Sequence, residues 1–318
     1  MKELNAIIVG GTGQFGLTIA KLLIKKKYKV VVTTRSIKRK KNLIKKFDNL
    51  DFFELDIYNK SKIKKLIRKI NPNIIFYLAG QSSPKKSFEQ KEETLKSNVV
   101  GCKNILEIID KEKINCKFLN ATSSEMFGKI NGKIKFSSLK KPYSPYGHAK
   151  LKSFNITKKF RFEKKIKAYN AIIFNTESYL RDNDFLIPKI CIAAIKAKKY
   201  GKRTAFGDIN IIREWNWCEE QSKYLLKFLE KKPQDFILSN GKYYSVRQMI
   251  QFAFNYFKLN YLKYITINKN YFRNKEVKNK ISNYKICLKR NNIKRDNKIY
   301  GKKIIELMIK KYLYEQRF

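Results

Sequence analysis

The fold is decided by residues 5–16, NAIIVGGTGQFG. The first half, Asn5–Val9, is a short apolar run typical of a buried β-strand. The second half is a glycine-rich loop that leads into Gly16–Lys26, where apolar residues recur with helical periodicity. Glycines allow a tight turn and let a pyrophosphate approach the backbone at the helix N-terminus. A strand, this loop and a helix in succession therefore predict a dinucleotide-binding site.

Strand and helix patterns continue to alternate as far as residue 174. The predicted strands are Lys29–Thr34, Leu50–Glu54, Asn73–Leu78, Lys117–Ala121 and Ala168–Phe174. The predicted helices are Ser61–Lys69, Glu92–Lys111 and Tyr146–Phe162. This alternation predicts an α/β fold of the Rossmann type, in which helices cover both faces of a doubly wound parallel sheet.

The alternation ends after Asn175. We therefore predict a Rossmann domain in residues 1–175, completed by parts of residues 213–240, and a smaller mixed α/β substrate-binding lobe formed mostly by residues 176–318. The predicted elements of this half are short strands at Thr204–Phe206 and Asp235–Leu238 and helices at Pro188–Ala197, Cys218–Leu229, Ser245–Tyr256 and Lys302–Tyr314.

Composition limits the classes of protein to which this chain can belong. The chain has 318 residues and 43% hydrophobic content, which suffices for a sizeable core. No run of about 18 apolar residues is present, so we expect no membrane span. Five scattered cysteines without C-x-x-C spacing, and an N-terminus without signal-peptide features, favour a reduced, cytoplasmic protein. With a single histidine, His148, and no cysteine cluster, we expect no metal site.

The formal net charge of +46 has two interpretations. It could serve binding to nucleic acid or to an anionic membrane, or it could reflect a lysine-biased composition at tolerant surface positions. The lysines are spread along the chain, and no nucleic-acid-binding motif accompanies them. We therefore expect no specific nucleic-acid partner and no membrane partner, although the charge should attract a phosphorylated substrate.

The end of the second predicted strand bears on the choice of cofactor. An acidic residue there would bind the ribose 2′-hydroxyl of NAD, whereas Arg35 followed by Ser36 suits the 2′-phosphate of NADP. Arg35 could also be one more surface cation. We predict NADP rather than NAD. The residues that we expect to contact it are Gly10, Gly13, Gln14, Phe15, Gly16, Arg35, Ser36, Asp56, Ile57, Leu78, Ala79, Gln81 and Ser82, together with Tyr146 and Lys150.

Residues 120–150 carry the chemistry. Tyr146 and Lys150 are four apart in a predicted helix, so they project from one face, and an ammonium beside a phenol favours the phenolate that acts as a general base. Ser123 can hydrogen-bond a substrate oxygen. Glu125 is a second, independent acid or base. Oxidation of an alcohol needs only the first pair, so the additional carboxylate indicates elimination of water.

Together these motifs resemble the extended short-chain dehydrogenase/reductase superfamily, and within it the GDP-mannose 4,6-dehydratases, over nearly the whole chain. The segments most particular to this branch are Phe174–Ser178 (FNTES), Ser245–Arg247 (SVR) and Tyr271–Val277 (YFRNKEV). The resemblance implies an NADP-dependent nucleotide-sugar 4,6-dehydratase. Its substrate would be GDP-mannose or a related GDP-hexose or heptose, its product the 4-keto-6-deoxy sugar, and its assembly a homodimer or homotetramer.

The resemblance also assigns residues. Ser123, in the place of the family's threonine, and Glu125, Tyr146 and Lys150 would be catalytic. Arg181 would contact the cofactor. The implied substrate-binding residues are Ser82, Ser123, Asn175, Lys189, Arg213, Ser245, Arg247, Arg273 and Glu276.

Three segments depart from the family pattern. Thr176 stands where the family has histidine, Tyr179–Asp182 (YLRD) replaces Pro-Arg-Arg-Gly, and Ile187–Lys189 (IPK) replaces Thr-Arg-Lys. These departures bear on cofactor binding, assembly and the identity of the sugar.

Two alternatives remain open. A nucleotide-sugar 4-reductase, C4 oxidase or epimerase of the same superfamily would need Ser123, Tyr146 and Lys150 but not Glu125. A regulatory or nucleic-acid-binding protein that kept the fold would explain the charge but not the complete catalytic set.

Overall fold

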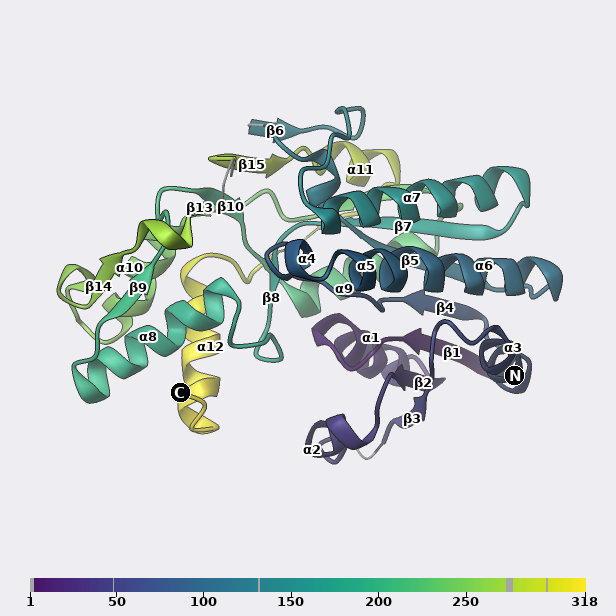
Figure 1. Ribbon diagram of the computed structural model, residues 1–318, viewed down its shortest axis with the longest axis horizontal. Helices are drawn as coiled ribbons and strands as arrows, with labels where there is room; N and C mark the ends of the chain where they lie inside the picture. The colour runs from purple at the N-terminus through teal and green to yellow at the C-terminus, as the bar shows by residue number, and fades with distance from the viewer. Residues whose placement is uncertain (1–2, 48, 131, 273–276, 296) are drawn as a thin grey trace. The chain divides into compact units, whose positions relative to one another are not determined.

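The computed structural model describes residues 3–47, 49–130, 132–272, 277–295 and 297–318 (Figure 1). The chain forms two compact units, each built from several segments. Unit 1 comprises Met1–Gly128, Ser138–Ile173 and Ser222–Leu238. Unit 2 comprises Lys129–Ser137, Phe174–Gln221 and Ser239–Phe318.

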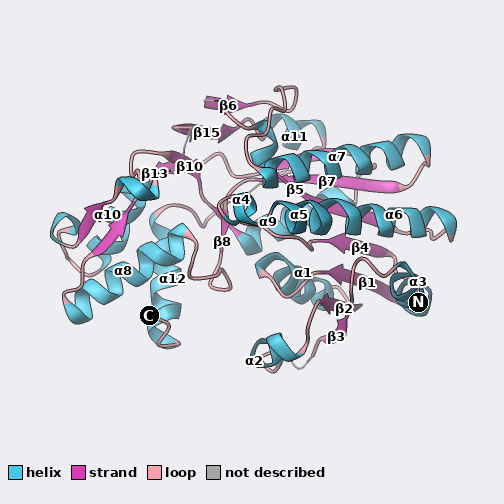
Figure 2. Cartoon of the chain, viewed as in Figure 1, coloured by secondary structure: helices cyan, strands magenta, loops and turns pink. Residues whose placement is uncertain are grey.

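A parallel sheet of seven strands forms the centre of unit 1, in the order β12-β7-β5-β4-β1-β2-β3 (Figure 2). The order reverses between β1 and β4, and ligands of open α/β sheets bind at the carboxyl ends of the strands at such a point. This topology confirms the predicted Rossmann-type sheet. The strands are β1 (Leu4–Val9), β2 (Tyr28–Thr34), β3 (Asp51–Glu54), β4 (Ile74–Tyr77), β5 (Lys117–Ser123), β7 (Lys167–Ile173) and β12 (Asp235–Leu238).

Helices flank this sheet (Figure 1). Helices α3, α6 and α7 pack against one face, where their aliphatic side chains join those of the strands in a core that includes Ile67, Ile105 and Phe118. The helices and helical turns of this part of the chain are α1 (Gln14–Lys25), η1 (Lys38–Lys40), α2 (Lys41–Ile44), α3 (Lys60–Ile70), α4 (Lys86–Glu89), α5 (Lys91–Leu95), η2 (Lys96–Val100), α6 (Gly101–Lys111), η3 (Ser124–Phe127), α7 (Pro145–Glu163) and α9 (Cys218–Leu229).

The prediction of one continuous α-helix at Glu92–Lys111 is wrong for residues 96–100. The structure has α5, then a π-helical turn, η2, and then α6. The hydroxyl of Tyr77 donates a hydrogen bond to the carbonyl of Ser97 within this turn. Insertion of a side-chain partner into the helix ladder is a recognised cause of such a local widening.

Unit 2 is a mixed assembly of short strands and helices, as expected for the second lobe. Its four-stranded sheet has the order β13-β10-β15-β6, in which only β10 and β13 are antiparallel. Two-stranded parallel sheets join β8 to β11 and β9 to β14. The strands are β6 (Gly132–Ile134), β8 (Thr176–Glu177), β9 (Thr204–Phe206), β10 (Ile212–Glu214), β11 (Asn216–Trp217), β13 (Tyr243–Ser245), β14 (Ile265–Ile267) and β15 (Asn279–Ser282).

Three helices of unit 2, α8, α10 and α12, share a hydrophobic core with Trp215 and Trp217. The predictions for these helices are confirmed, with ends that differ by at most a few residues. The short strands other than β9 were not predicted, because two to four residues show no periodicity. The helices and helical turns are α8 (Leu186–Tyr200), α10 (Val246–Tyr256), η4 (Tyr261–Lys263), η5 (Lys269–Tyr271), α11 (Lys285–Arg290) and α12 (Lys302–Tyr314).

Three further observations concern the protein as a whole. Within the described ranges, no helix has both the length and the apolar character needed to cross a membrane. The described part of the chain also contains no group of three or more His, Cys, Asp or Glu side chains that could hold a metal ion. All five cysteines are buried and have free thiols.

Candidate functional site

The glycine-rich loop lies at the switch point of the sheet in unit 1. Gly10 follows β1 and has a φ of +70°, a conformation that suits glycine. A Cβ atom on Gly10 would lie 2.5 Å from Cα of Ala79, so this loop and the segment after β4 are in direct contact. The N–H of Leu78 donates to the carbonyl of Val9 at 2.9 Å, which fixes the two loops side by side.

The N-terminus of α1 suits a pyrophosphate. Gly13 is the N-cap residue and has no side chain with which to cap this helix end. The first turn contains no acidic residue. A Cβ on Gly13 would meet nothing within 4 Å, whereas one on Gly16 would lie 2.2 Å from the carbonyl oxygen of Gly11. The helix is thus packed tightly against its own loop, and its N-terminus has open space beside Gly13, next to the half-buried Gln14 and Phe15.

The ends of β2 and β3 present polar groups to solvent. Arg35 is exposed and pairs with Glu93, with 3.0 Å between Nη1 and Oε1. Exposed pairs of this kind contribute little, so the guanidinium can exchange its partner for a phosphate. Ser36 Oγ accepts from the N–H of Arg39 at 3.4 Å, and Asp56 Oδ1 accepts from the N–H of Tyr58 at 2.9 Å.

The remaining predicted cofactor residues of unit 1 differ in exposure. The carbonyl of Ile57 accepts from Asn104 Nδ2 at 3.1 Å, which ties the loop after β3 to α6. Gln81 is partly buried, and its Nε2 donates to the carbonyl of Ser83 at 2.8 Å. Ser82, between them, is exposed.

The four predicted catalytic residues lie at adjacent places in unit 1. Ser123 ends β5, and its Oγ accepts from the N–H of Glu125 at 3.2 Å. Helix α7 begins with the cap residue Ser144, whose Oγ accepts from the N–H of Gly147 at 3.0 Å. A Cβ on Gly147 would lie 2.7 Å from the carbonyl oxygen of Glu125. The first turn of α7, which carries Tyr146, is therefore pressed against the turn that carries Glu125.

Lys150 lies one helical turn after Tyr146 and is buried. Its Nζ donates to the carbonyl of Ala121 at 2.7 Å and lies 5.7 Å from the centre of the Tyr146 ring. Burial lowers the pKa of Lys150 to about 8. At neutral pH the side chain is therefore still mainly an ammonium group, close to a phenol that it can help to ionise.

Unit 2 contains the predicted substrate-binding cations, each held by neighbouring groups. Lys189 Nζ donates to the carbonyl of Ala205 at 2.7 Å and lies 5.0 Å and 4.9 Å from the ring centres of Phe206 and Tyr271. Arg213 is buried, and its Nη1 donates to the carbonyls of Ile212 and Lys278 at 2.8 Å and 3.1 Å.

The other predicted substrate residues of unit 2 are partly buried. Arg247 donates from Nη1 to the hydroxyl of Tyr261 at 3.2 Å and from Nη2 to Oδ1 of Asn210 at 3.0 Å. Ser245 pairs with Ile212 in the β10–β13 ladder and caps α10, which places it beside the strand of Arg213. The carbonyl of Asn175 accepts from the N–H and the side chain of Asn216 at 3.0 Å and 2.7 Å. Arg273 and Glu276 lie outside the described residues.

The departure at residues 179–182 has a structural counterpart in unit 2. Arg181 stacks on the ring of Phe185 at 3.9 Å, and its Nε lies 3.4 Å from Oε2 of the buried Glu177. Burial raises the pKa of Glu177 to about 7, although Arg181 opposes the shift. Arg317 donates to the carbonyls of Tyr179 and Arg181 and so holds the loop from the far end of the chain.

Three features of the site escaped the sequence analysis. Glu93, the partner of Arg35, lies 58 residues away in the chain. Glu214, directly after Arg213, is buried and accepts from both the N–H and the hydroxyl of Ser282. The acceptor for Lys150 is a backbone carbonyl, which no side-chain pattern marks. Of these three features, only Glu214 left a signal in the sequence, because it directly follows Arg213, a predicted substrate-binding residue.

Comparison with known proteins identifies the family. The family model for GDP-mannose 4,6 dehydratase matches residues 7–298. The chain belongs to this family. GDP-mannose 4,6 dehydratase 2 of Caenorhabditis elegans is 32% identical over 266 residues, which cover 78% of this chain and 69% of the relative. The human GDP-mannose 4,6 dehydratase is 30% identical over 266 residues, which cover 78% of this chain and 71% of the relative.

Solved structures show that this member of the GDP-mannose 4,6-dehydratase family shares its fold with other nucleotide-sugar enzymes. A dTDP-glucose 4,6-dehydratase from Streptomyces venezuelae, solved with NAD bound, superimposes with a TM-score of 0.86 at 15% identity, covering 98% of each chain. UDP-glucose 4-epimerase from Thermotoga maritima gives 0.85 at 20% identity, covering 99% of this chain and 100% of the epimerase. The family match confirms the predicted branch, the GDP-mannose 4,6-dehydratases, and these superpositions confirm the predicted fold.

Proposed function

We propose that the protein is a nucleotide-sugar 4,6-dehydratase, a hydro-lyase that converts GDP-mannose, or a related GDP-hexose or heptose, into the 4-keto-6-deoxy sugar. One observation carries this proposal. The turn that holds Glu125 is packed against the first turn of α7, which holds Tyr146. Oxidation at one carbon needs only a single base, so a carboxylate beside the tyrosine supports a second proton transfer.

The cofactor that we propose is NADP. The glycine N-cap of α1, the absence of acidic residues from its first turn and the open space beside Gly13 fit a pyrophosphate, and Arg35 with Ser36 supports a 2′-phosphate. Bound there, NADP would supply the hydride acceptor that oxidation at C4 needs and the hydride donor that reduction at C6 needs. Arg181 we propose as a further contact of this cofactor.

The protein residues move the protons. Tyr146 Oη, assisted by the ammonium of Lys150, takes the proton of the C4 hydroxyl, while Ser123 Oγ donates to O4. A ketone at C4 acidifies the C5 hydrogen, which Glu125 removes. Glu125 then protonates the C6 hydroxyl, which leaves as water. After a hydride is delivered to C6, Tyr146 returns to C5 the proton that it took from the C4 hydroxyl. The product retains the ketone at C4 and carries a methyl group at C6.

For the substrate we propose that basic groups of unit 2 hold the diphosphate. Lys189, Arg213 and Arg247 present nitrogen donors that form charge-assisted bonds to phosphate oxygens. The proposal extends to Ser82, Asn175 and Ser245 as polar contacts, and to Arg273 and Glu276 as ligands of the ribose or the base. We further propose that the protein works in the cytoplasm as a homodimer or homotetramer.

The test is incubation of the purified protein with GDP-mannose and a catalytic amount of NADP. We expect a product that is lighter by one water and carries a carbonyl group, detected by mass spectrometry before and after borohydride reduction. Parallel reactions with UDP-, CDP- and dTDP-sugars and with NAD define specificity. An epimerised sugar of unchanged mass, or no product from any nucleotide sugar, would contradict the proposal.

A further inference from the structure

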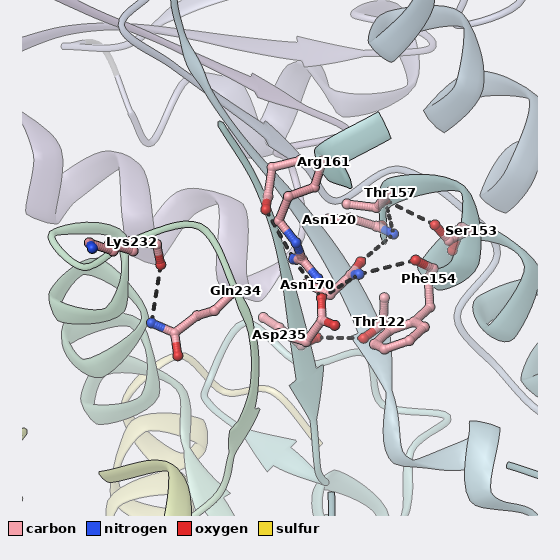
Figure 3. A network of polar contacts seen from close by, with 12 residues as sticks. Asn120, Thr122, Ser153, Phe154, Thr157, Arg161, Asn170, Lys232, Gln234 and Asp235 are labelled. Atoms are coloured by element: carbon pink, nitrogen blue, oxygen red, sulfur yellow. Dashed lines mark hydrogen bonds and ion pairs between the residues drawn. The ribbon is translucent and has the colours of Figure 1, made fainter. Parts of the chain in front are cut away.

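A row of buried polar side chains crosses the sheet of unit 1 beneath α7 (Figure 3). Asn170 on β7 pairs in register with Asn120 on β5 and with Asp235 on β12. Register partners in a parallel sheet point to the same face, so the three side chains stand side by side. Asn120 and Asn170 are both 0% exposed.

Hydrogen bonds connect this row along its length. Asn120 Nδ2 donates to Oδ1 of Asn170 at 3.2 Å, and Asn170 Nδ2 donates to Oδ1 of Asp235 at 2.9 Å. At the end of the row, Arg161 of α7 donates from Nη1 to the same Asp235 oxygen at 2.7 Å. The Arg161–Asp235 pair is itself nearly buried, with side-chain exposures of 9% and 6%.

The row also holds the backbone and side chains of α7. Asn170 Nδ2 donates to the carbonyl of Phe154 at 3.1 Å, and Asn120 Nδ2 donates to Oγ1 of Thr157 at 3.1 Å. Together with Arg161, these contacts fix the helix at successive turns. A shift of α7 along the strands would break all of them at once, whereas aliphatic contacts would tolerate it.

The same helix and strand carry the catalytic groups. Lys150 precedes Phe154 by one helical turn, and its ammonium donates to the carbonyl of Ala121, the residue that follows Asn120 in β5. Ser153 Oγ donates to the carbonyl of Lys150 at 3.1 Å, and Thr157 Oγ1 donates to the carbonyl of Ser153 at 2.9 Å. Helix α7 is therefore attached to β5 at two places, Thr157 and Lys150, and bonds within the helix connect these two residues through Ser153.

We infer that Asn120 and Asn170 are positioning residues, which set the place of α7 on the sheet and so hold Tyr146 and Lys150 in their catalytic geometry. The inference rests on the roles proposed above for those two residues. An unpartnered oxygen supports it, because Asn120 Oδ1 is buried and has no hydrogen-bond partner among the described residues. A row that leaves a polar atom unsatisfied is costly for stability alone, and buried polar groups are retained in some proteins because they specify one arrangement.

The test is the double variant N120L/N170L. Leucine has nearly the shape of asparagine, and replacing both partners of a buried bond by apolar groups is often close to neutral for stability. Thr157 keeps its bond to Ser153, and Asp235 keeps Arg161. We expect a folded protein whose kcat falls by about tenfold or more, while KM for GDP-mannose stays within about twofold.

The matched control is Tyr169→Phe. Tyr169 lies next to Asn170 on β7, and its buried hydroxyl donates to the carbonyl of Lys231 at 2.7 Å, away from α7. Loss of this bond lowers stability without touching the polar row. We expect kcat to be unchanged, so a fall in kcat with both variants would show a general effect of destabilisation and overturn the inference.

A second readout does not depend on turnover. Hydrogen exchange of peptides from residues 145–163 should be faster by about tenfold in N120L/N170L and unchanged in Tyr169→Phe. Thr157→Val provides a milder variant if the double variant does not fold. If the wild-type protein makes no keto sugar, the proposed function fails and the exchange of these peptides decides the inference by itself. Wild-type exchange of these peptides in folded N120L/N170L, or in Thr157→Val where the double variant does not fold, would overturn it.

Discussion

The ammonium group of Lys150 donates to the carbonyl oxygen of Ala121, at 2.7 Å from Nζ to O. This bond anchors the end of a long, buried side chain. Burial lowers the pKa of Lys150 from 10.5 to about 8, so the charge that we propose assists Tyr146 would be lost within an accessible pH range.

We therefore predict a fall of kcat above about pH 8 as Lys150 loses its proton. Lys150→Arg should remove this alkaline limb, because a guanidinium stays charged throughout, although misplacement will lower the rate at every pH. Lys150→Met should reduce kcat by about 100-fold or more at pH 7. The measurement is keto-sugar formation between pH 6 and pH 10. An alkaline limb that persists in Lys150→Arg would assign it to another group.

Glu125→Gln should separate oxidation from elimination. The amide cannot take the C5 proton, so we expect keto-deoxy product formation to fall by about 10²-fold or more. Oxidation at C4 uses Tyr146 and should continue, so reduced nicotinamide should accumulate in amounts comparable to the enzyme. Tyr146→Phe is the control, in which neither product nor reduced nicotinamide should form. Wild-type rates in Glu125→Gln would remove this residue from the mechanism.

Two glycines of the same loop should respond differently to alanine. In Gly10→Ala the new Cβ would lie 2.5 Å from backbone Cα of Ala79 at a φ of +70°, so we expect a loss of about 1–3 kcal/mol of stability. In Gly13→Ala nothing lies within 4 Å, so the protein should keep its melting temperature but bind NADP about tenfold more weakly. Thermal melting with and without NADP measures both effects.

Arg35→Ala should lower the preference for NADP over NAD by about tenfold or more, because the guanidinium no longer binds the 2′-phosphate. Stability should change by less than about 1 kcal/mol, since the pair with Glu93 is exposed. The measurement is kcat/KM for the activation of the protein by each cofactor after removal of bound nucleotide. Glu93→Gln is the control, and it should leave the preference for NADP intact or increase it.

Glu177→Gln should stabilise the protein in alkaline solution. Burial raises the pKa of Glu177 from 4.5 to about 7, so the folded state binds the proton more tightly than the unfolded state does. The associated stability is present below pH 4.5 and is lost as the pH rises through 7. The neutral amide avoids this loss, so the variant should gain about 2–3 kcal/mol at pH 8 and little at pH 5. Urea unfolding at the two pH values tests it, and an equal effect at both would contradict the assignment.

Sequence reasoning succeeded where the signal is local. The β1 strand, the glycine loop and α1 follow one another within 22 residues, from Leu4 to Lys25, and each has its own periodicity or turn chemistry. The predicted helix at Tyr146–Phe162 is confirmed as α7, and its signal is likewise local. This helix alone places Tyr146 and Lys150 on one face.

The structural features that the sequence did not predict depend on partners that are distant in the chain. The π-helical turn accepts a hydrogen bond from the hydroxyl of Tyr77, which lies 20 residues before its acceptor, Ser97. β10 acquires its structure by pairing with β13 and β15, and three residues are too few to show a strand pattern. Asn120 and Asn170 look like interruptions of apolar strands until their register is known.

Asp235 is the shared partner of Arg161 and Asn170. The order in which the chain is synthesised therefore determines when these two residues can pair with it. The strand that supplies it, β12, emerges from the ribosome after α7, β7 and much of unit 2. Until then β7 is an edge strand, and Arg161 and Asn170 lack the partner that they have in the complete sheet. A fragment ending at residue 175 would leave β7 in that state, so we expect unit 1 to be complete only once β12 is present and not to be separable by cutting the chain after β7.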